Sequence, residues 1–253
     1  MFQPKSPQEI AIMARGGAIL AKTFRRLRHA AYTGITTKEL DELARKLVLS
    51  YGAKPAFLGY ASGASGKKFP ASLCVSVGDE VVHGIPGTRF LKDGDIAGLD
   101  LGVLYNGFYT DSAITIGIGA ISKKAQRLIE VTERALYLGI DMARLGNTTG
   151  DIGQAVQSYV EAQGFSVVRD LVGHGIGREL HEEPQVPNYG KVDRGIKLEE
   201  GMVVAIEPMV TEGSWQVVLS PDGWTYKTAD GSLSAHFEHT VAITKKGPRI
   251  LTK

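Results

Sequence analysis

The sequence predicts an α+β fold built from two similar halves, each with helices followed by strands. Apolar residues recur at helical spacing at the start of each half, and segments rich in β-branched residues follow. Residues 34–52 begin Gly-Ile-Thr-Thr and end at Gly52, and residues 146–164 begin Gly-Asn-Thr-Thr and end at Gly164, an offset of 112. Thr caps and Gly ends are common in amphipathic helices, so this repeat supports duplication without establishing it.

The first half is predicted to hold two helices and then strands. Ser6-Pro7-Gln8-Glu9 is a capping box, so a first helix should run to about residue 29. A second should begin at Thr36 or Thr37 and stop at Gly52, which suits a left-handed cap position. Strands are expected at 72–77, 95–104 and 109–118, with a hairpin turn at Asn106-Gly107.

The second half repeats this order. Helices are expected at 122–144 and 148–163, and strands at 165–171, 202–211, 215–227 and 236–244. Residues 61–68 contain Gly, Ser and Lys and are expected to form a mobile surface loop. No Pro- or Ser-rich linker separates residues 1–120 from 121–253, which predicts a single domain over 1–253.

Composition excludes several classes of protein. Hydrophobic residues make up 43% and charged residues 22%, as in globular proteins. The net charge is only +2 with scattered basic residues, so no nucleic-acid-binding surface is expected. No signal peptide and no long apolar span is found, which predicts no membrane association. The single cysteine, Cys74, cannot form an intrachain disulfide, and a cytoplasmic location is expected.

Four carboxylates stand in apolar strand-like segments, where an ionised group is costly unless it is paired or binds metal. They are Asp100, Asp111, Glu207 and Glu238. Each alone fits a strand end, a salt bridge or a turn; the four together, with the glycine-flanked His174, predict a metal centre. Four negative charges balance two divalent cations, and an oxygen-rich set with one imidazole suits Mn, Fe, Co or Zn.

These residues lie in stretches that resemble the type I methionine aminopeptidases, and the resemblance spans essentially the whole chain. One such motif would be weak, whereas seven in order are specific. The seven are Glu80-Val81-Val82-His83-Gly84-Ile85-Pro86, Leu99-Asp100-Leu101-Gly102, Asp111-Ser112-Ala113, Gly173-His174-Gly175-Ile176-Gly177-Arg178, His181-Glu182-Glu183-Pro184-Gln185-Val186-Pro187, Ile206-Glu207-Pro208-Met209 and Phe237-Glu238-His239-Thr240-Val241.

The resemblance implies the pita-bread fold, with two pseudo-symmetric α/β halves around a central antiparallel sheet that carries a dinuclear metal site. It implies that two metals are bound by the five residues named above, with Asp111 and Glu238 bridging. His83 and His181 would contact the substrate rather than the metals. An apolar pocket for the methionine side chain would be lined by Tyr60, Phe69, Cys74, Leu180 and Trp224.

The implied activity is hydrolytic removal of the initiator methionine from nascent proteins and peptides when the second residue is small. A metal-bound hydroxide would attack the peptide carbonyl. Glu207 would act as general base and acid, and His181 and His83 would donate to the developing oxyanion or the carbonyl. Expected partners are nascent polypeptide N-termini, with the ribosome as one place of contact, and a monomer is the default.

Some features leave alternatives open. Phe69 and Leu180 replace the Tyr and the aromatic residue that the family usually has, and residues 61–68 resemble an insertion beside the pocket, so methionine could be held more loosely. His236 and His239 bracket Glu238 and are either outer partners or simple neighbours.

Two other functions fit part of the pattern. Prolidases and Xaa-Pro aminopeptidases share the five ligands but usually carry a large N-terminal domain, whereas about 80 residues precede His83 here. A pita-bread protein that only binds would be expected to have lost ligands, and all five are present.

Overall fold

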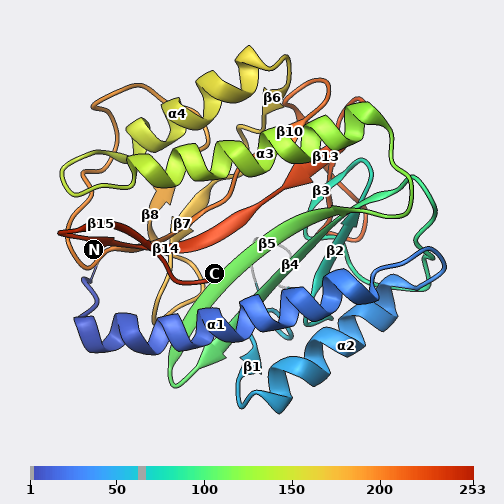
Figure 1. The fold of residues 1–253 in the computed structure, drawn as a ribbon, viewed down its shortest axis with the longest axis horizontal. Helices are drawn as coiled ribbons and strands as arrows, with labels where there is room; N and C mark the ends of the chain where they lie inside the picture. The colour runs from blue at the N-terminus through green and yellow to red at the C-terminus, as the bar shows by residue number, and fades with distance from the viewer. Residues whose placement is uncertain (1–2, 62–66) are drawn as a thin grey trace.

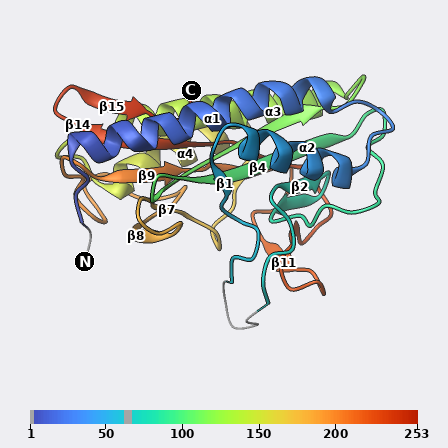
Figure 2. The same ribbon diagram turned by 90° about the horizontal axis from the view of Figure 1, so that it is seen from below.

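The computed structural model describes residues 3–61 and 67–253. Within these ranges four helices lie along one face of a central sheet (Figures 1 and 2). The helices are α1 (Pro7–Ala30), α2 (Thr37–Ser50), α3 (Lys123–Met142) and α4 (Thr149–Ala162). None of the helices in this part of the chain is long and apolar enough to cross a membrane.

The central sheet is antiparallel and runs through both halves, in the order β1-β4-β5-β14-β9-β7-β8. Its strands are β1 (Lys54–Pro55), β4 (Ile96–Tyr105), β5 (Phe108–Gly117), β14 (Glu238–Thr244), β9 (Val203–Ile206), β7 (Gly173–Gly175) and β8 (Glu182–Val186). Two further strands join it: β2 (Cys74–Val77) pairs with β4, and β15 (Gly247–Ile250) pairs with β14. The late strand β14 therefore lies between β5 of the first half and β9 of the second.

Two small sheets flank the central one in the described chain. The first has the order β13-β10-β6, with bounds Ser234–His236, Met209–Thr211 and Ser166–Val167. The second has the order β11-β12-β3, with bounds Val217–Leu219, Tyr226–Thr228 and Glu80–Val82. Each sheet contains a residue, Met209 of β10 or Val82 of β3, that lines a groove next to the central sheet.

The four helix predictions are confirmed, because local signals set their ends. Ser6, Thr36 and Thr148 each form a capping box, and Ser122 accepts a hydrogen bond from the amide of Ala125. The bounds of α4 follow those of α2 by 112 residues. Their buried positions match at the same offset: Thr37, Leu40, Ala44 and Val48 in α2, and Thr149, Ile152, Val156 and Val160 in α4.

The strand predictions hold best in the first half. The β4–β5 hairpin turns at Asn106-Gly107, whose φ angles of 48° and 84° are the left-handed values that such a tight turn requires. In the second half the segment 202–211 breaks at Glu207-Pro208 into two strands, since proline cannot donate to the ladder. Segment 165–171 shortens to β6, and β1, β3, β7, β8 and β15 were not predicted. Of the expected loop 61–68, residues 62–66 lie outside the described residues.

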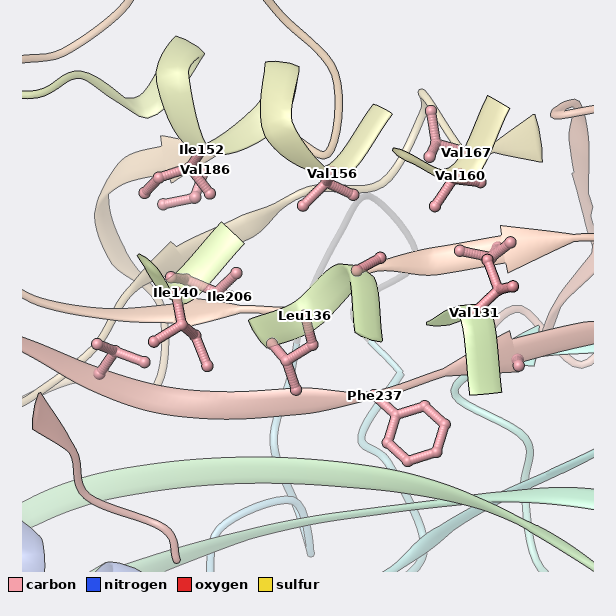
Figure 3. Packing of buried hydrophobic residues seen from close by; sticks show 14 of the residues in the cluster. Val131, Leu136, Ile140, Ile152, Val156, Val160, Val167, Val186, Ile206 and Phe237 are labelled. Atoms are coloured by element: carbon pink, nitrogen blue, oxygen red, sulfur yellow. The ribbon is translucent and has the colours of Figure 1, made fainter. Parts of the chain in front are cut away.

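The two largest clusters of buried apolar residues in the described chain lie between the helices and the central sheet. Leu136 and Ile140 of α3, Val156 of α4 and Ile206 of β9 belong to one cluster (Figure 3). Gly139 lets α3 and α4 approach closely, since a Cβ there would lie 2.9 Å from the Cγ2 of Val156. Because these two clusters cover the helix side, polar side chains of the central strands can gather on the other face of the sheet.

Candidate metal centre

The register of three adjacent strands brings three of the predicted ligands together. Ala113 of β5 pairs with Asp100 of β4 on one side and with Glu238 of β14 on the other. Asp111 lies two residues before Ala113, and residues two apart in a strand point to the same face. Asp100, Asp111 and Glu238 therefore project from neighbouring strands toward one place.

The other two ligands come from the next strands in the sheet. Glu207 follows Ile206 of β9, which pairs with His239 of β14, and His174 lies in β7. The His174 Nε2 atom is 3.6 Å from Glu207 Oε1. Ligand atoms of Asp111, His174 and Glu238 all lie within 4.8 Å of one another. In sheet order, β4, β5, β14, β9 and β7 each supply or immediately precede one of the five residues.

The four carboxyl groups sit in surroundings that oppose their ionisation. Burial, and then the charge of Asp111, raises the pKa values of Asp100, Glu207 and Glu238 well above their ordinary range. Burial also raises the pKa of Asp111 to about 7, although the Ser112 amide donates to it. The four negative charges therefore need a compensating positive charge at this place.

The donor atoms fit divalent cations. Among the described residues, Asp100 Oδ1 and Glu238 Oε1 are buried without a hydrogen-bond partner, which is costly unless a cation binds them. The Nδ1 atom of His174 lies 2.8 Å from the carbonyl oxygen of Gly175, so it carries the proton and leaves the Nε2 lone pair free. Burial lowers the pKa of His174 to about 3, which keeps the ring neutral as a ligand must be.

All twelve residues predicted for the site line one cavity. It is bounded by Tyr60, Phe69, Cys74, His83, Asp100, Asp111, His174, Leu180, His181, Glu207, Trp224 and Glu238, and also by Phe57. Its apolar end is aromatic: the ring of Phe69 meets those of Phe57 and Trp224 edge-on, at centroid distances of 6.4 and 5.3 Å.

Phe57 is the lining residue that sequence reasoning missed. It belongs to none of the seven motifs, and the only signal was an apolar residue three positions before Tyr60. It is buried and also contacts the sheet, since a Cβ at Gly102 would lie 2.8 Å from its ring. Its side chain therefore closes the cavity from the β4 side.

Two neutral histidines border the cavity beside the carboxylates. Burial lowers the pKa of His83 to about 4 and that of His181 below its usual value. The His181 ring lies 4.3 Å from that of His174, and its Nδ1 is 2.5 Å from the Tyr60 hydroxyl. When that hydroxyl donates to Nδ1, Nε2 of His181 carries the proton and can donate to a substrate oxygen.

The structure separates the two histidines that flank Glu238. His236 is buried with its Nε2 3.6 Å from Glu207 Oε2, so it is an outer neighbour of the carboxylate cluster. The Nδ1 of His239 instead contacts the Thr252 hydroxyl at 2.8 Å, and its ring lies near that of Tyr137. His239 therefore belongs to the helix side of the sheet.

A groove continues from the cavity. It shares His83, His174, His181 and Glu207 with the cavity, and its remaining lining residues are Val82, Leu171, Val172, Gly173, Glu182, Glu183, Gln185 and Met209. A chain that places its first residue in the apolar cavity can thus extend along this groove past the carboxylates.

Comparisons with known proteins agree with this geometry. A methionine aminopeptidase of Clostridium perfringens is 52% identical over 248 residues, which are 98% of this chain and 97% of that protein. The crystal structure of a methionine aminopeptidase from Thermotoga maritima superposes with a TM-score of 0.95 at 44% identity, with both chains fully covered.

A prolidase from Pyrococcus horikoshii matches less well. Its TM-score is 0.79 at 25% identity, and the match covers 99% of this chain but 63% of the prolidase. The predicted pita-bread fold is confirmed by these neighbours. The sequence pattern of metallopeptidase family M24 matches residues 11–245. With its fold, its carboxylate-rich centre and these relatives in agreement, the chain belongs to metallopeptidase family M24.

Proposed function

We propose that this chain is a metal-dependent aminopeptidase that removes an N-terminal methionine from polypeptides. The observation that carries the proposal is the cavity that combines an aromatic end with the five predicted ligands in one lining. A relative that is 52% identical over nearly the whole chain is a methionine aminopeptidase, which supports the same activity. The match to the longer prolidase is weaker, so the prolyl alternative is not favoured.

The cavity suits an unbranched, polarisable side chain. The edges of Phe57, Phe69 and Trp224 surround its apolar end, and a thioether makes favourable contacts with aromatic rings. Burial raises the pKa of the Cys74 thiol well above its usual value, so the thiol stays neutral and acts as apolar wall. Leu180 is buried beside it, and the branched leucine closes the pocket in place of an aromatic ring.

The five predicted ligands would hold the divalent ions, and three of them, Asp111, His174 and Glu238, already bring ligand atoms within 4.8 Å of one another. When bound, such ions polarise a peptide carbonyl, bind the free α-amine and acidify a water molecule. Mn, Fe, Co and Zn all suit this donor set. The requirement for a free amine would restrict cleavage to the first peptide bond.

The other polar groups handle protons and the developing charge. Glu207 lies where cavity and groove meet, so its carboxylate can take a proton from water and return it to the leaving amine. His181, with its proton on Nε2, can donate to the carbonyl oxygen as that oxygen gains charge. His83 lines both the cavity and the groove, and it would donate to the substrate backbone near the same carbonyl group.

The substrates would be nascent polypeptides whose second residue is small. The residues after the methionine would follow the groove that begins at the carboxylates. A protein with one buried, unpaired cysteine suits a reducing compartment, so we place this activity in the cytoplasm. A monomer that meets chains at or after the ribosome is the simplest form of the proposal.

The test compares two peptides. Chelator-treated protein is assayed with Met-Ala-Ser and with Ala-Pro-Ser, with and without Mn²⁺ or Co²⁺. Metal-dependent release of methionine from the first peptide alone is expected. Cleavage of the proline peptide instead would move the chain to the prolyl group.

Two variants link the activity to the site. Glu207→Gln and His174→Ala should abolish turnover, whereas Glu200→Gln, which changes an exposed carboxylate, should not. Retention of most of the kcat by either site variant would overturn its assignment.

A further inference from the structure

The residues that place Leu180 and His181 in the cavity form no strand or helix. Residues 176–181, here called the His181 loop, connect β7 with β8. Within the loop the amide of Gly177 donates to the carbonyl oxygen of Glu179 at 3.1 Å. The position of His181 therefore depends on contacts that the loop makes with other parts of the molecule.

Glu182 fastens the loop from its C-terminal end. Its Oε1 accepts hydrogen bonds from the amides of Arg178 at 2.6 Å and Glu179 at 3.1 Å. Its Oε2 pairs with the ammonium of Lys5, 177 residues earlier in the chain. One carboxylate thus closes the loop on itself and ties it to the N-terminal segment.

Lys5 is a buried cation in a fixed position. Its side chain is 1% exposed, and its amide donates to the carbonyl oxygen of Gly201 at 2.8 Å. The side chain crosses directly over Gly177, where a Cβ would lie 2.1 Å from the Lys5 Cε. The glycine thus makes room for the lysine.

Two further contacts lead to the same loop. Arg178 pairs with Glu9 of α1, so the N-terminal segment contacts the loop twice. The amide of Tyr109 in β5 donates to the carbonyl oxygen of Gly177 at 2.7 Å, two residues before the carboxylate of Asp111. The loop is thereby held between the N-terminal segment and the strand that carries a predicted ligand.

We propose that Lys5 is a positioning residue, which acts through Glu182 to hold His181 at the substrate carbonyl. The inference rests on the proposed function, in which His181 donates to the carbonyl oxygen. A buried ion pair adds little net stability compared with apolar residues of the same size, and in some proteins its role is to specify one conformation. Here the conformation so specified is that of the loop, and the Tyr60 hydroxyl then fixes the ring.

A double-mutant cycle between Lys5 and His181 tests this role. Lys5→Met keeps the length and apolar stem of the side chain and removes the charge. We expect it to lower kcat for Met-Ala-Ser by about tenfold to a hundredfold, because a misplacement of about 1 Å costs that much. In a His181→Ala background the same change should lower the residual kcat less than about twofold, since the group being positioned is gone.

A purely structural role gives a different result. Equal fold-losses of kcat in the two backgrounds would overturn the proposal. The matched control is Lys245→Met, which removes the lysine of an exposed ion pair with Glu200 and should leave kcat unchanged in both backgrounds. All assays are made well below the thermal midpoint of the least stable variant, so that unfolding does not enter kcat.

Two safeguards keep the result interpretable. If Lys5→Met does not fold, Lys5→Met/Glu182→Gln takes its place, because it removes both charges and keeps an amide oxygen for the loop hydrogen bonds. If the unaltered protein releases no methionine, the proposed function fails. If it releases methionine and the Lys5 variant keeps kcat within about twofold, the positioning role alone fails.

Discussion

Helices α2 and α4 occupy equivalent places in the two halves. In both, the residues just before the helix form backbone hydrogen bonds with an extended segment from elsewhere in the same half. In each half, one leucine exchanges backbone hydrogen bonds with two residues that precede the Thr cap. These exchanges join Leu91 to Gly34 and Ile35, and Leu198 to Gly146 and Asn147. Each half therefore has an equivalent helix, an equivalent threonine cap and an equivalent extended segment paired with the residues before that cap.

They differ in how the helix face that carries residue 41 in α2 and residue 153 in α4 contacts the neighbouring chain. Asp41 of α2 accepts hydrogen bonds from the amides of Ser72 and Leu73, at 2.8 and 2.9 Å, just before Cys74 of the cavity wall. The equivalent residue in α4 is Gly153, where a Cβ would lie 2.3 Å from the carbonyl oxygen of Tyr189. One half holds its loop by a side chain and the other by direct contact of backbones.

The two kinds of contact allow the attached segments different freedom of movement. A carboxylate on a side chain can follow small movements of the loop that it holds. Two backbones in contact at a glycine leave no such freedom, because any added atom must displace one of them. We infer that the wall near Cys74 tolerates change better than the segment that follows β8.

The largest effect should come from the place where the halves meet. Asp111→Asn removes a ligand supplied by the first half, and Glu238→Gln removes one supplied by the second. Each should lower kcat more than about a hundredfold, since changes to outer partners of metal ligands already cost 10- to 100-fold. Steady-state kinetics with saturating Mn²⁺ measure this, and Asp141→Asn on the exposed side of α3 is the control. A much smaller loss for one of them would show that the halves contribute unequally.

A direct test of the α2 and α4 difference concerns stability. Gly153→Ala should lower the free energy of unfolding by about 2 kcal/mol, because overpacking against Tyr189 outweighs the helix propensity gained. Asp41→Ala should instead act on the cavity, raising KM for Met-Ala-Ser more than it changes kcat, because the chain before Cys74 loses its anchor. Urea unfolding and kinetics separate the two effects. An unchanged stability for Gly153→Ala would contradict the close contact.

The metal centre should also show how burial opposes the ionisation of a carboxylate at the place where the halves meet. The pKa of Asp111, raised to about 7 chiefly by burial, means that the metal-free protein holds this proton below pH 7. Cation binding must release it, so Mn²⁺ affinity should fall at least about tenfold between pH 8 and pH 6. Titration calorimetry at pH 6 in two buffers of different ionisation enthalpy would detect the released proton. Buffer-independent heats at pH 6 would refute this prediction.

The smallest effect tests what the halves share. Thr36→Ala and Thr148→Ala each remove a cap that makes the same pair of hydrogen bonds, and each should cost about 1 kcal/mol of unfolding free energy. Thermal or urea unfolding of both variants measures the two losses. Losses that differ by more than the cost of one cap would show that the two helix starts are not equivalent.

The sequence predicted features that are set by neighbouring residues. The helix ends follow from caps three residues away, and the β4–β5 hairpin follows from Asn106-Gly107, so it could be expected that Asp100 and Asp111 lie on two paired strands. The other three ligands were found by their unusual surroundings and by resemblance. Their short strands are fixed by pairing between distant segments.

Contacts between residues far apart in the chain could not be predicted from the sequence. Lys5 and Glu182 are 177 residues apart, and neither stands out as a member of a pair. Phe57 lies in a segment without motif, and the break at Glu207-Pro208 interrupts what otherwise resembles a continuous strand. Tertiary packing decides such features, and local propensity says little about them.

The central place of β14 has a consequence for how the protein is made. Glu238 is synthesised after the other four predicted ligands, yet its strand is inserted between β5 and β9 in the middle of the sheet. A growing chain on the ribosome thus lacks both the last ligand and the strand that joins the halves. The protein therefore cannot acquire the proposed activity until Glu238 and the rest of β14 have been synthesised and inserted between β5 and β9.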